Sequence, residues 1–486
     1  MSQPFVEPCS RGMIAAAPCP RELRRGVPYS QRRIVLTACI LASSMAFIDG
    51  SALTVALPRL RADFNADLAS VQWVLNGYVL ALASLTLIGG ALADVHGKAR
   101  MLALGSLLFG LASAACAVAP SPGWLIAARV AQGAAAAIVT PASLALIGAI
   151  FPRGERSRAI GIWAAASALT TAGGPVLGGW LTETFGWPAV FWINPPLSLA
   201  VVAILWRFAP TDRREPRRFD VAGAAILAAA LGLLAWVLSQ LGPVGSGGGD
   251  DVPRSKIWGI AAVALLGAAG LRFYAHWERR SPHPMTPPYL ARNRAFVGLN
   301  LATLLSYSSL AIMFFLLPFD LVDRRGLPST GAGLAFLPFT LTVGLLSRLF
   351  GRLADTAGPR TMLVAGPAGA ALAYLWMAVG RDLPLTLGVI GPMALLGLSF
   401  AVLVAPLTAS VMSSVDEADE GLASGINNAT SRIAQLAGIA LAGGIATFAA
   451  GYETALAIAA VASMGGAAVI TATIPRGLAQ VEDQPK

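Results

Sequence analysis

Long apolar runs make up most of the chain, and short segments rich in arginine, glycine and proline separate them. A helix that crosses a bilayer needs about 20 mostly apolar residues, and fourteen such runs can be delimited. The pattern therefore predicts an all-α polytopic membrane protein with 14 transmembrane helices. The predicted spans are 34–57, 71–93, 101–119, 124–149, 158–181, 189–206, 221–241, 256–275, 296–319, 332–350, 361–379, 384–411, 422–449 and 454–474.

The composition agrees with this prediction and sets the orientation. Of the residues, 56% are hydrophobic and 12% are charged, whereas about 25% are charged in an ordinary soluble protein. With the N-terminus in the cytosol, the cytoplasmic segments hold 26 of the 35 lysines and arginines, and the outer loops hold 7. This asymmetry follows the positive-inside rule, so we expect a multi-pass protein of the cell membrane with both termini in the cytosol. The net charge of +10 then reflects these loops and indicates no nucleic-acid partner.

A repeat of thirteen residues divides the chain into two related halves. Gly90–Leu102 and Gly351–Leu363 are identical at seven positions and are offset by 261 residues. Parallel repeats are typical of transporters whose substrate site lies between two halves near the bilayer midplane. The predicted segments are a disordered cytoplasmic tail at 1–33, a six-helix bundle at 34–208, a linker with two additional transmembrane helices at 209–295, a second six-helix bundle at 296–475 and a cytoplasmic tail at 476–486.

Both copies of the repeat lie on a short loop that is predicted to be cytoplasmic. Glycine allows a tight turn there, and Asp94 can bind helix N-terminal amides or a neighbouring basic group in one conformation only. Asp94 would then latch an inner gate, and a solvated turn is the simpler alternative. The first copy resembles the loop motif of the major facilitator superfamily. The resemblance implies a cytoplasmic gate made of Gly90, Asp94, Gly97, Lys98 and Arg100 and, in the second half, of Gly351, Asp355, Gly358 and Arg360.

A second motif lies in the fifth predicted span. Small residues recur there every four positions and form a strip on which another helix can approach closely, namely Ala166, Thr170, Gly174 and Gly178. Pro175 removes a backbone hydrogen bond and bends the helix. Such strips also serve plain helix packing. The motif resembles the antiporter motif of the same superfamily, which implies an exporter, through Gly174, Pro175, Gly178 and Gly179.

Two residues of opposite charge lie inside the N-terminal spans. Arg129 in the fourth span costs at least about 2.5–3.5 kcal/mol to insert, so it should face a cavity or a partner unless it snorkels to the surface. Asp49 is the only acidic residue well inside a predicted span. A carboxyl that can be protonated or ionised there is what proton coupling requires, and a hydrogen bond that packs two helices is the alternative.

The surroundings of both residues extend the resemblance. The segment from Asp49 to Pro58 resembles the first span of the fourteen-helix branch of the drug/proton antiporters, in which an acidic residue precedes a Val-Ala-Leu-Pro ending. Arg129 matches the arginine that is linked to proton transfer in the superfamily. The resemblance implies the major facilitator fold, with two six-helix bundles and two inserted helices, and proton coupling by Asp49 and Arg129.

Arg432 is a further charge within a span, about eleven residues inside the thirteenth. It could contact an anionic group of a substrate or pair with another helix, and the sequence leaves both interpretations open.

The predicted function is that of a proton-coupled secondary transporter that exports small hydrophobic or cationic compounds by alternating access. A proton-coupled importer of a small nutrient or metabolite is the alternative. The chain shows neither the phosphate-binding loop of an ATP-driven pump nor a catalytic cluster of a membrane enzyme, so we expect no enzyme, no metal and no cofactor. The expected partners are the small-molecule substrate, protons and the lipid bilayer, and we expect the protein to function as a monomer.

Overall fold

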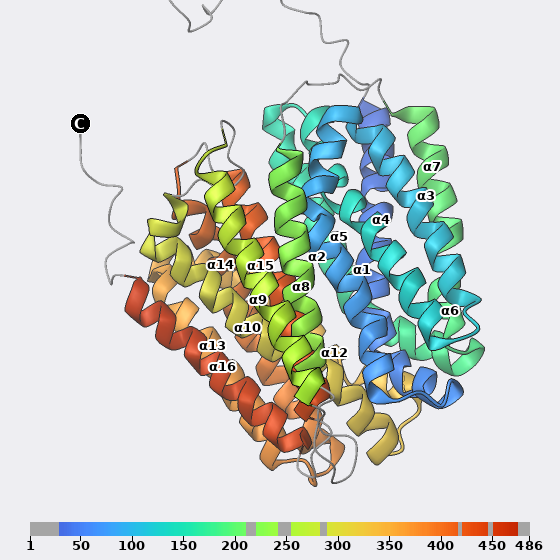
Figure 1. Cartoon of the computed structure of the whole chain (residues 1–486), viewed down its shortest axis with the longest axis vertical. Helices are drawn as coiled ribbons and strands as arrows, with labels where there is room; N and C mark the ends of the chain where they lie inside the picture. The colour runs from blue at the N-terminus through green and yellow to red at the C-terminus, as the bar shows by residue number, and fades with distance from the viewer. Residues whose placement is uncertain are drawn as a thin grey trace, which may run out of the picture.

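The computed structural model describes residues 29–209, 220–241, 254–281, 289–416, 420–445 and 451–474, and these are almost entirely helical (Figure 1). The predicted tails at 1–33 and 476–486 therefore lie almost wholly outside the described residues. The first half of the chain consists of α1 (Tyr29–Asp63), α2 (Leu68–His96), α3 (Lys98–Ala117), α4 (Pro122–Ile150), α5 (Arg153–Phe185), the short α6 (Pro188–Trp192) and α7 (Asn194–Phe208).

Two long helices connect this half to the second. They are α8 (Val221–Leu241) and α9 (Arg254–Glu278), which pack against each other at the front of the view in Figure 1. The second half consists of η1 (Leu290–Arg292), α10 (Arg294–Phe319), η2 (Asp320–Arg324), α11 (Ser329–Leu334), α12 (Leu337–Ala357), α13 (Pro359–Val379), η3 (Thr386–Ile390), α14 (Gly391–Ser413), α15 (Glu420–Ile445) and α16 (Gly451–Thr473).

Local sequence signals explain where several helices begin and end. The Asp67 carboxylate accepts a hydrogen bond from the Ser70 amide at 2.9 Å and so caps α2. Hydrogen bonding to the side chain of Ser70 and to its amide lowers the pKa of the Asp67 carboxyl below its ordinary value. Gly97, between α2 and α3, and Gly358, between α12 and α13, have φ angles of 102° and 82°, which glycine adopts without strain. The two copies of the sequence repeat thus make the same turn.

The two ends of the helical bundle are named here by their turns. The motif end carries the turns at Gly97 and Gly358, and the distal end carries the turns at Asn65 and Gly326. Each long helix runs from one end to the other, so Asp49 and Arg129 both lie between the ends.

The number of membrane-length helices is lower than the predicted fourteen. Within the described residues, eleven helices are long and apolar enough to cross a membrane, and α5 makes a twelfth if its two segments count as one span. These segments, Arg158–Thr171 and Gly173–Phe185, meet at an angle of 40°, because Pro175 has no amide hydrogen for the carbonyl of Thr171. The two other predicted spans fall short, since α8 gives only the apolar segment Ala225–Leu234 and α15 carries many polar residues.

The buried apolar residues form three clusters whose positions show how the halves meet. The largest cluster lies toward the distal end and joins both halves, for example Leu57 and Val74 of the first with Phe315 and Phe336 of the second. Toward the motif end each half has a cluster of its own; the second half contributes Leu436 to the cluster of the first. The halves are therefore packed together at the distal end and separate toward the motif end.

Polar contacts join the halves at the same distal end. The side chain of Gln72 on α2 donates a hydrogen bond to the carbonyl of Ile439 on α15 at 2.6 Å. The amide of Thr330 on α11 donates to the carboxylate of Glu183 on α5 at 2.9 Å. Since α2, α5, α11 and α15 come from both halves, these contacts reinforce the closure of the distal end.

Candidate functional site

A buried ion pair lies inside the first half. Asp49 on α1 and Arg129 on α4 are both 0% exposed, and the guanidinium Nη1 of Arg129 binds the carboxylate Oδ2 of Asp49. The other carboxylate oxygen accepts hydrogen bonds from Gln132 Nε2 at 2.8 Å and from Asn194 Nδ2 at 3.4 Å. Three helices, α1, α4 and α7, thus supply the groups around one carboxylate.

Further contacts fix the orientation of the Arg129 guanidinium. Its Nε donates to the carbonyl of Val74 at 3.1 Å, and its Nη1 also donates to Gln132 Oε1 at 2.7 Å. The centre of the guanidinium lies 4.2 Å from the centroid of the Tyr78 ring and 5.7 Å from that of Phe191, within range of cation–π attraction. Its Nη2 has no hydrogen-bond partner among the described residues.

An outer layer of polar groups holds the carboxamides in place. Asn194 also donates from Nδ2 to Ser113 Oγ at 2.9 Å, and that hydroxyl donates to the carbonyl of Phe191 at 2.9 Å. The thiol of Cys116 lies 3.6 Å from Gln132 Oε1. The sequence predicts the two charges as a site, but it does not predict Gln132, Asn194 and Tyr78 as their partners. Gln132 had a detectable signal, because three residues after Arg129 it falls on the same helix face.

The arrangement supports one specific chemistry, the gain and loss of a proton. A buried ion pair is stable while both charges are present, and loss of one partner leaves an uncompensated buried charge that costs about 3–5 kcal/mol. A proton on Asp49 would have this effect on Arg129. Both side chains are enclosed, so proton exchange with water requires a movement of the helices around them.

The glycines of the fifth span lie where α1, α5 and the second half meet. A Cβ atom at Gly178 would come within 2.3 Å of the carbonyl oxygen of Ala52, and one at Gly174 would collide with Ser51. Gly179 faces the second half, where its Cβ would lie 2.3 Å from the carbonyl oxygen of Ser329. Pro175 lies in the same contact, because its carbonyl oxygen is 2.3 Å from the Cβ position of Gly333.

In the first loop motif, the acidic side chain lies close to a basic residue of the same motif. Asp94 Oδ1 lies 4.0 Å from Lys98 Nζ, across the turn formed by Gly97. Gly90 faces Pro141 of α4, with 3.6 Å between its Cβ position and the Pro141 Cβ. Arg100 is exposed on the first turn of α3.

The second loop motif is only partly described. Gly351 faces Ala405 of α14 at 3.5 Å, Gly358 forms the turn, and Arg360 donates a hydrogen bond to the carbonyl of Thr471 on α16 at 2.9 Å. The side chain of Asp355 lies outside the described part of the chain. The motif residues of the two halves thus lie at the motif end, away from the Asp49–Arg129 pair.

Arg432 lies half-buried on α15 of the second half. Its Nη1 donates to Gln435 Oε1 at 3.2 Å on the same helix. Two residues further along α15, the carbonyl of Ala434 accepts a hydrogen bond from Ser308 Oγ of α10 at 3.0 Å, and α15 also packs against α2 of the first half. Arg432 therefore lies on a helix that contacts both halves.

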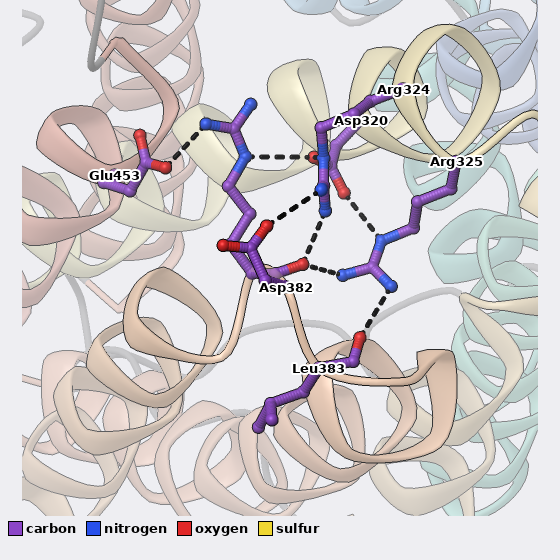
Figure 2. Close-up of polar contacts among 7 residues, drawn as sticks. Asp320, Arg324, Arg325, Asp382, Leu383 and Glu453 are labelled. Carbon is purple, nitrogen blue, oxygen red and sulfur yellow. Dashed lines mark hydrogen bonds and ion pairs between the residues drawn. The ribbon is translucent and has the colours of Figure 1, made fainter.

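A cluster of ionic contacts at the distal end was not predicted from the sequence. Asp320, whose side chain is 1% exposed, accepts hydrogen bonds from Arg324 Nε at 2.6 Å, Arg325 Nε at 3.0 Å and Arg381 Nε at 3.4 Å (Figure 2). Arg381 also pairs with Glu453 at 2.6 Å, and Arg324 with Asp382 at 3.2 Å. These residues tie together the end of α10, the segment after α13 and the start of α16.

A smaller polar contact joins the two linking helices. Asp220 accepts hydrogen bonds from the Gly223 amide at 2.8 Å, from Trp277 Nε1 at 2.7 Å and from Ser281 Oγ at 3.1 Å. Burial alone would raise the pKa of the Asp220 carboxyl, but these hydrogen bonds outweigh burial and lower it below its ordinary value. The start of α8 is thereby fixed to the end of α9.

The fold and the site define the class of this protein. Apolar helices of membrane length, arranged in two halves around charged residues buried between the ends, make up a multi-pass membrane transporter. The chain belongs to the Major Facilitator Superfamily, whose family model matches residues 39–277 and 299–485.

Similar proteins refine this assignment. The cephamycin export protein CmcT of Amycolatopsis lactamdurans is 35% identical over 427 residues, which are 85% of this chain and 85% of that protein. The multidrug resistance protein Stp of Mycobacterium tuberculosis (strain CDC 1551 / Oshkosh) is 32% identical and is matched over 85% of this chain and 75% of its own. A crystal structure of the peptide transporter POT in complex with sulfate has a TM-score of 0.69 at 15% identity, covers 92% of this chain and 94% of its own, and shows the shared fold. The relatives are antibiotic and multidrug export proteins of the superfamily, so this chain is a transporter of small molecules.

Proposed function

We propose that this protein exports small hydrophobic compounds from the cytosol in exchange for protons, by alternating access and as a monomer in the cell membrane. The observation that carries the proposal is the enclosed Asp49–Arg129 pair, because a single proton on Asp49 would cancel one of its charges. The direction of transport is supported by the printed names of the relatives, which are export and multidrug resistance proteins.

The contacts of Asp49 suit its deprotonated form. Its two oxygens accept hydrogen bonds from N–H groups of Arg129, Gln132 and Asn194. These donors compensate the negative charge of the carboxylate. We infer that this is the form left after a proton has been released to the cytosol. Substrate binding then permits outward opening, a proton from outside neutralises Asp49, and the protein returns to the starting conformation.

The packing of the halves supports one conformation within this cycle. We take the motif end as cytosolic because of the excess of basic residues there, and the halves are joined at the distal end. We therefore propose that this conformation is inward-facing. In the outward-facing form the motif ends of the two halves come together, and Asp94 would exchange its local contact with Lys98 for a latch between helices.

We also propose that the chain crosses the membrane fourteen times, as in the fourteen-helix branch of the superfamily. Eleven described helices and the bent α5 account for twelve spans. The remaining two are α8 and α15, which are 21 and 26 residues long, and about 20 residues suffice to cross the hydrocarbon core. The polar residues of α15 need not face lipid, because the helix packs between α2, α8 and α10.

Everted membrane vesicles provide the test of proton coupling. Respiration acidifies their interior, and an exported compound that exchanges for protons dissipates the pH gradient, which a fluorescent weak base reports. We expect cephamycin or a hydrophobic dye to give this response with the wild-type protein. Asp49→Asn should abolish it, because asparagine cannot exchange a proton.

The control is Asp63→Asn, which changes an exposed carboxylate at the end of α1 that pairs with Arg59 on the same helix. It should behave like the wild type. Equal responses from wild type and Asp49→Asn would overturn the assignment of Asp49. Uptake into right-side-out vesicles along an inward proton gradient would instead support the alternative function of an importer.

A further inference from the structure

Arg432 is a charged group inside the second half for which the described residues provide no counter-ion. Its hydrogen-bond acceptor is the neutral carboxamide of Gln435 at 3.2 Å. By contrast, Arg129 has the carboxylate of Asp49 as its partner. An arginine within a transmembrane helix is costly and as a rule faces a partner or a substrate path, so the missing anion needs an explanation.

The buried acids of the described residues are already engaged elsewhere. They are Asp49, Glu278 and Asp320, at 0%, 3% and 5% exposure. Asp320 binds three arginines at the distal end, and Glu278 lies at the last residue of α9. The two oxygens of Asp49 are occupied by Arg129, Gln132 and Asn194. A cationic substrate would therefore find none of these three described carboxylates available, whereas an anionic one would find the guanidinium of Arg432.

The surroundings of Arg432 suit an apolar molecule with one charged group. Tyr307 precedes Ser308, whose hydroxyl binds the carbonyl of Ala434 two residues after Arg432, and it begins a row of aromatic rings in the second half. Its ring centroid lies 6.1 Å from that of Phe400, which lies 5.9 Å from that of Phe339. Phe314 continues the row at 5.4 Å from Phe339. Aromatic rings offer large apolar contact areas with little loss of side-chain entropy.

Arg432 is also placed where both halves can respond to a ligand. Its helix, α15, packs against α2 of the first half and α10 of the second. Leu436, one helical turn after Arg432, belongs to the same buried cluster as Tyr78, and the Tyr78 ring stacks on Arg129. A group bound to Arg432 therefore lies about one helical turn from the cluster that contains the stacking partner of Arg129.

We propose that Arg432 is the anion-binding group of the transport site and that the exported compounds are amphipathic organic anions with an apolar or aromatic body and one carboxylate. The proposal rests on the function proposed above. The anionic group of the substrate neutralises the positive charge of Arg432. The apolar body of the substrate contacts the aromatic row from Tyr307 to Phe314.

The test compares two ligands of one shape and opposite charge, pyrenebutyrate and pyrenebutylamine. Binding to the purified full-length protein in detergent is followed by pyrene fluorescence without any ion gradient. We expect the wild type to bind the carboxylate at least tenfold more tightly than the amine. Arg432→Gln should remove this preference, and Arg432→Lys should keep part of it, because lysine retains the charge without the planar guanidinium.

The matched control is Arg59→Gln, which removes an exposed arginine at the end of α1 and should leave the preference unchanged. Absence of a preference for the carboxylate in the wild type overturns the proposal, and so does an equal preference in wild type and Arg432→Gln. If Arg432→Gln does not fold, the wild-type comparison and Arg432→Lys still decide.

A second readout separates this proposal from proton coupling. In proteoliposomes, one monoanion leaving for one proton entering moves two charges, so an imposed membrane potential should drive transport of pyrenebutyrate. One-for-one exchange of a monocation moves no net charge and would not respond. Asp49→Asn should lose proton exchange yet keep the preference for the carboxylate ligand. If Asp49→Asn keeps proton exchange, the proposal of proton coupling by Asp49 fails and the proposal for Arg432 is unaffected. If Arg432→Gln loses the preference for the carboxylate ligand while proton exchange remains, the assignment of Arg432 is supported.

Discussion

The energy of the Asp49–Arg129 pair can be measured with a double-mutant cycle. Asp49→Asn keeps the shape of the side chain and removes its charge, so Arg129 stays buried with neutral partners such as the carbonyl of Val74 and the carboxamide of Gln132. Breaking a buried pair in this way costs about 3–5 kcal/mol. In the double variant with Arg129→Gln, no buried charge remains and most of that loss should be recovered.

Thermal unfolding of the purified protein in detergent gives the magnitude. The entropy of unfolding is about 2.1 cal/mol/K per residue, so a cooperative unit made of the whole chain loses about 1 °C of Tm per kcal/mol. We therefore expect Asp49→Asn to lower Tm by about 3–5 °C, and the double variant to lie closer to the wild type than either single variant.

A surface pair provides the internal reference for this cycle. Arg59 Nε and Asp63 Oδ1 lie 3.2 Å apart on one helix, at 63% and 41% exposure, and such pairs contribute about 0.3–0.5 kcal/mol. A coupling energy between Asp49 and Arg129 no larger than that of this surface pair would refute the view that the buried pair stores the energy of a charge change.

Three further results are expected. Gly179→Val should lower transport, because the valine side chain would collide with the carbonyl of Ser329 and separate the halves. Cysteines introduced at the distal end should then react faster with a thiol reagent, and an unchanged rate would contradict this expectation. Asp320→Ala should lower Tm by several degrees in detergent, since it leaves three arginines without their shared carboxylate. The pKa of Asp220 is lowered by its hydrogen bonds, so the stability it contributes is complete above the unfolded pKa of about 3.9 and is lost as the pH falls through the folded value. The difference in Tm between wild type and Asp220→Ala should accordingly shrink on acidification below about pH 4 and stay constant above it.

The sequence indicated the two principal charges because a charged residue interrupts an apolar run visibly. Asp49 and Arg129 stand out for this reason, and the structure places them in contact. Their neutral partners could not be selected in the same way, since amides and hydroxyls occur in many spans at little cost. Asn194 becomes recognisable only when the start of α7 is packed against α1 and α3.

Two other features depend on packing that the sequence does not express. Asp320 and Arg381 lie near the ends of predicted spans, where charges are usually solvated, and only the fold brings them together with Arg324 and Arg325. The polar residues of α15 lower its mean hydropathy below that of a membrane span. The fold tolerates them because other helices cover α15. The repeat at Gly97 and Gly358, by contrast, depends on backbone geometry that glycine alone encodes, and both turns form.

The apolar cluster shared at the distal end has a consequence for how the molecule comes apart. One core contains residues of both halves, namely Leu57, Val74, Phe315 and Phe336. Neither half can therefore unfold without exposing apolar surface of the other. Calorimetry should then record one cooperative unfolding transition in place of two. Two co-expressed fragments divided between α8 and α9 should reassemble, because each fragment covers the apolar surface that the other exposes.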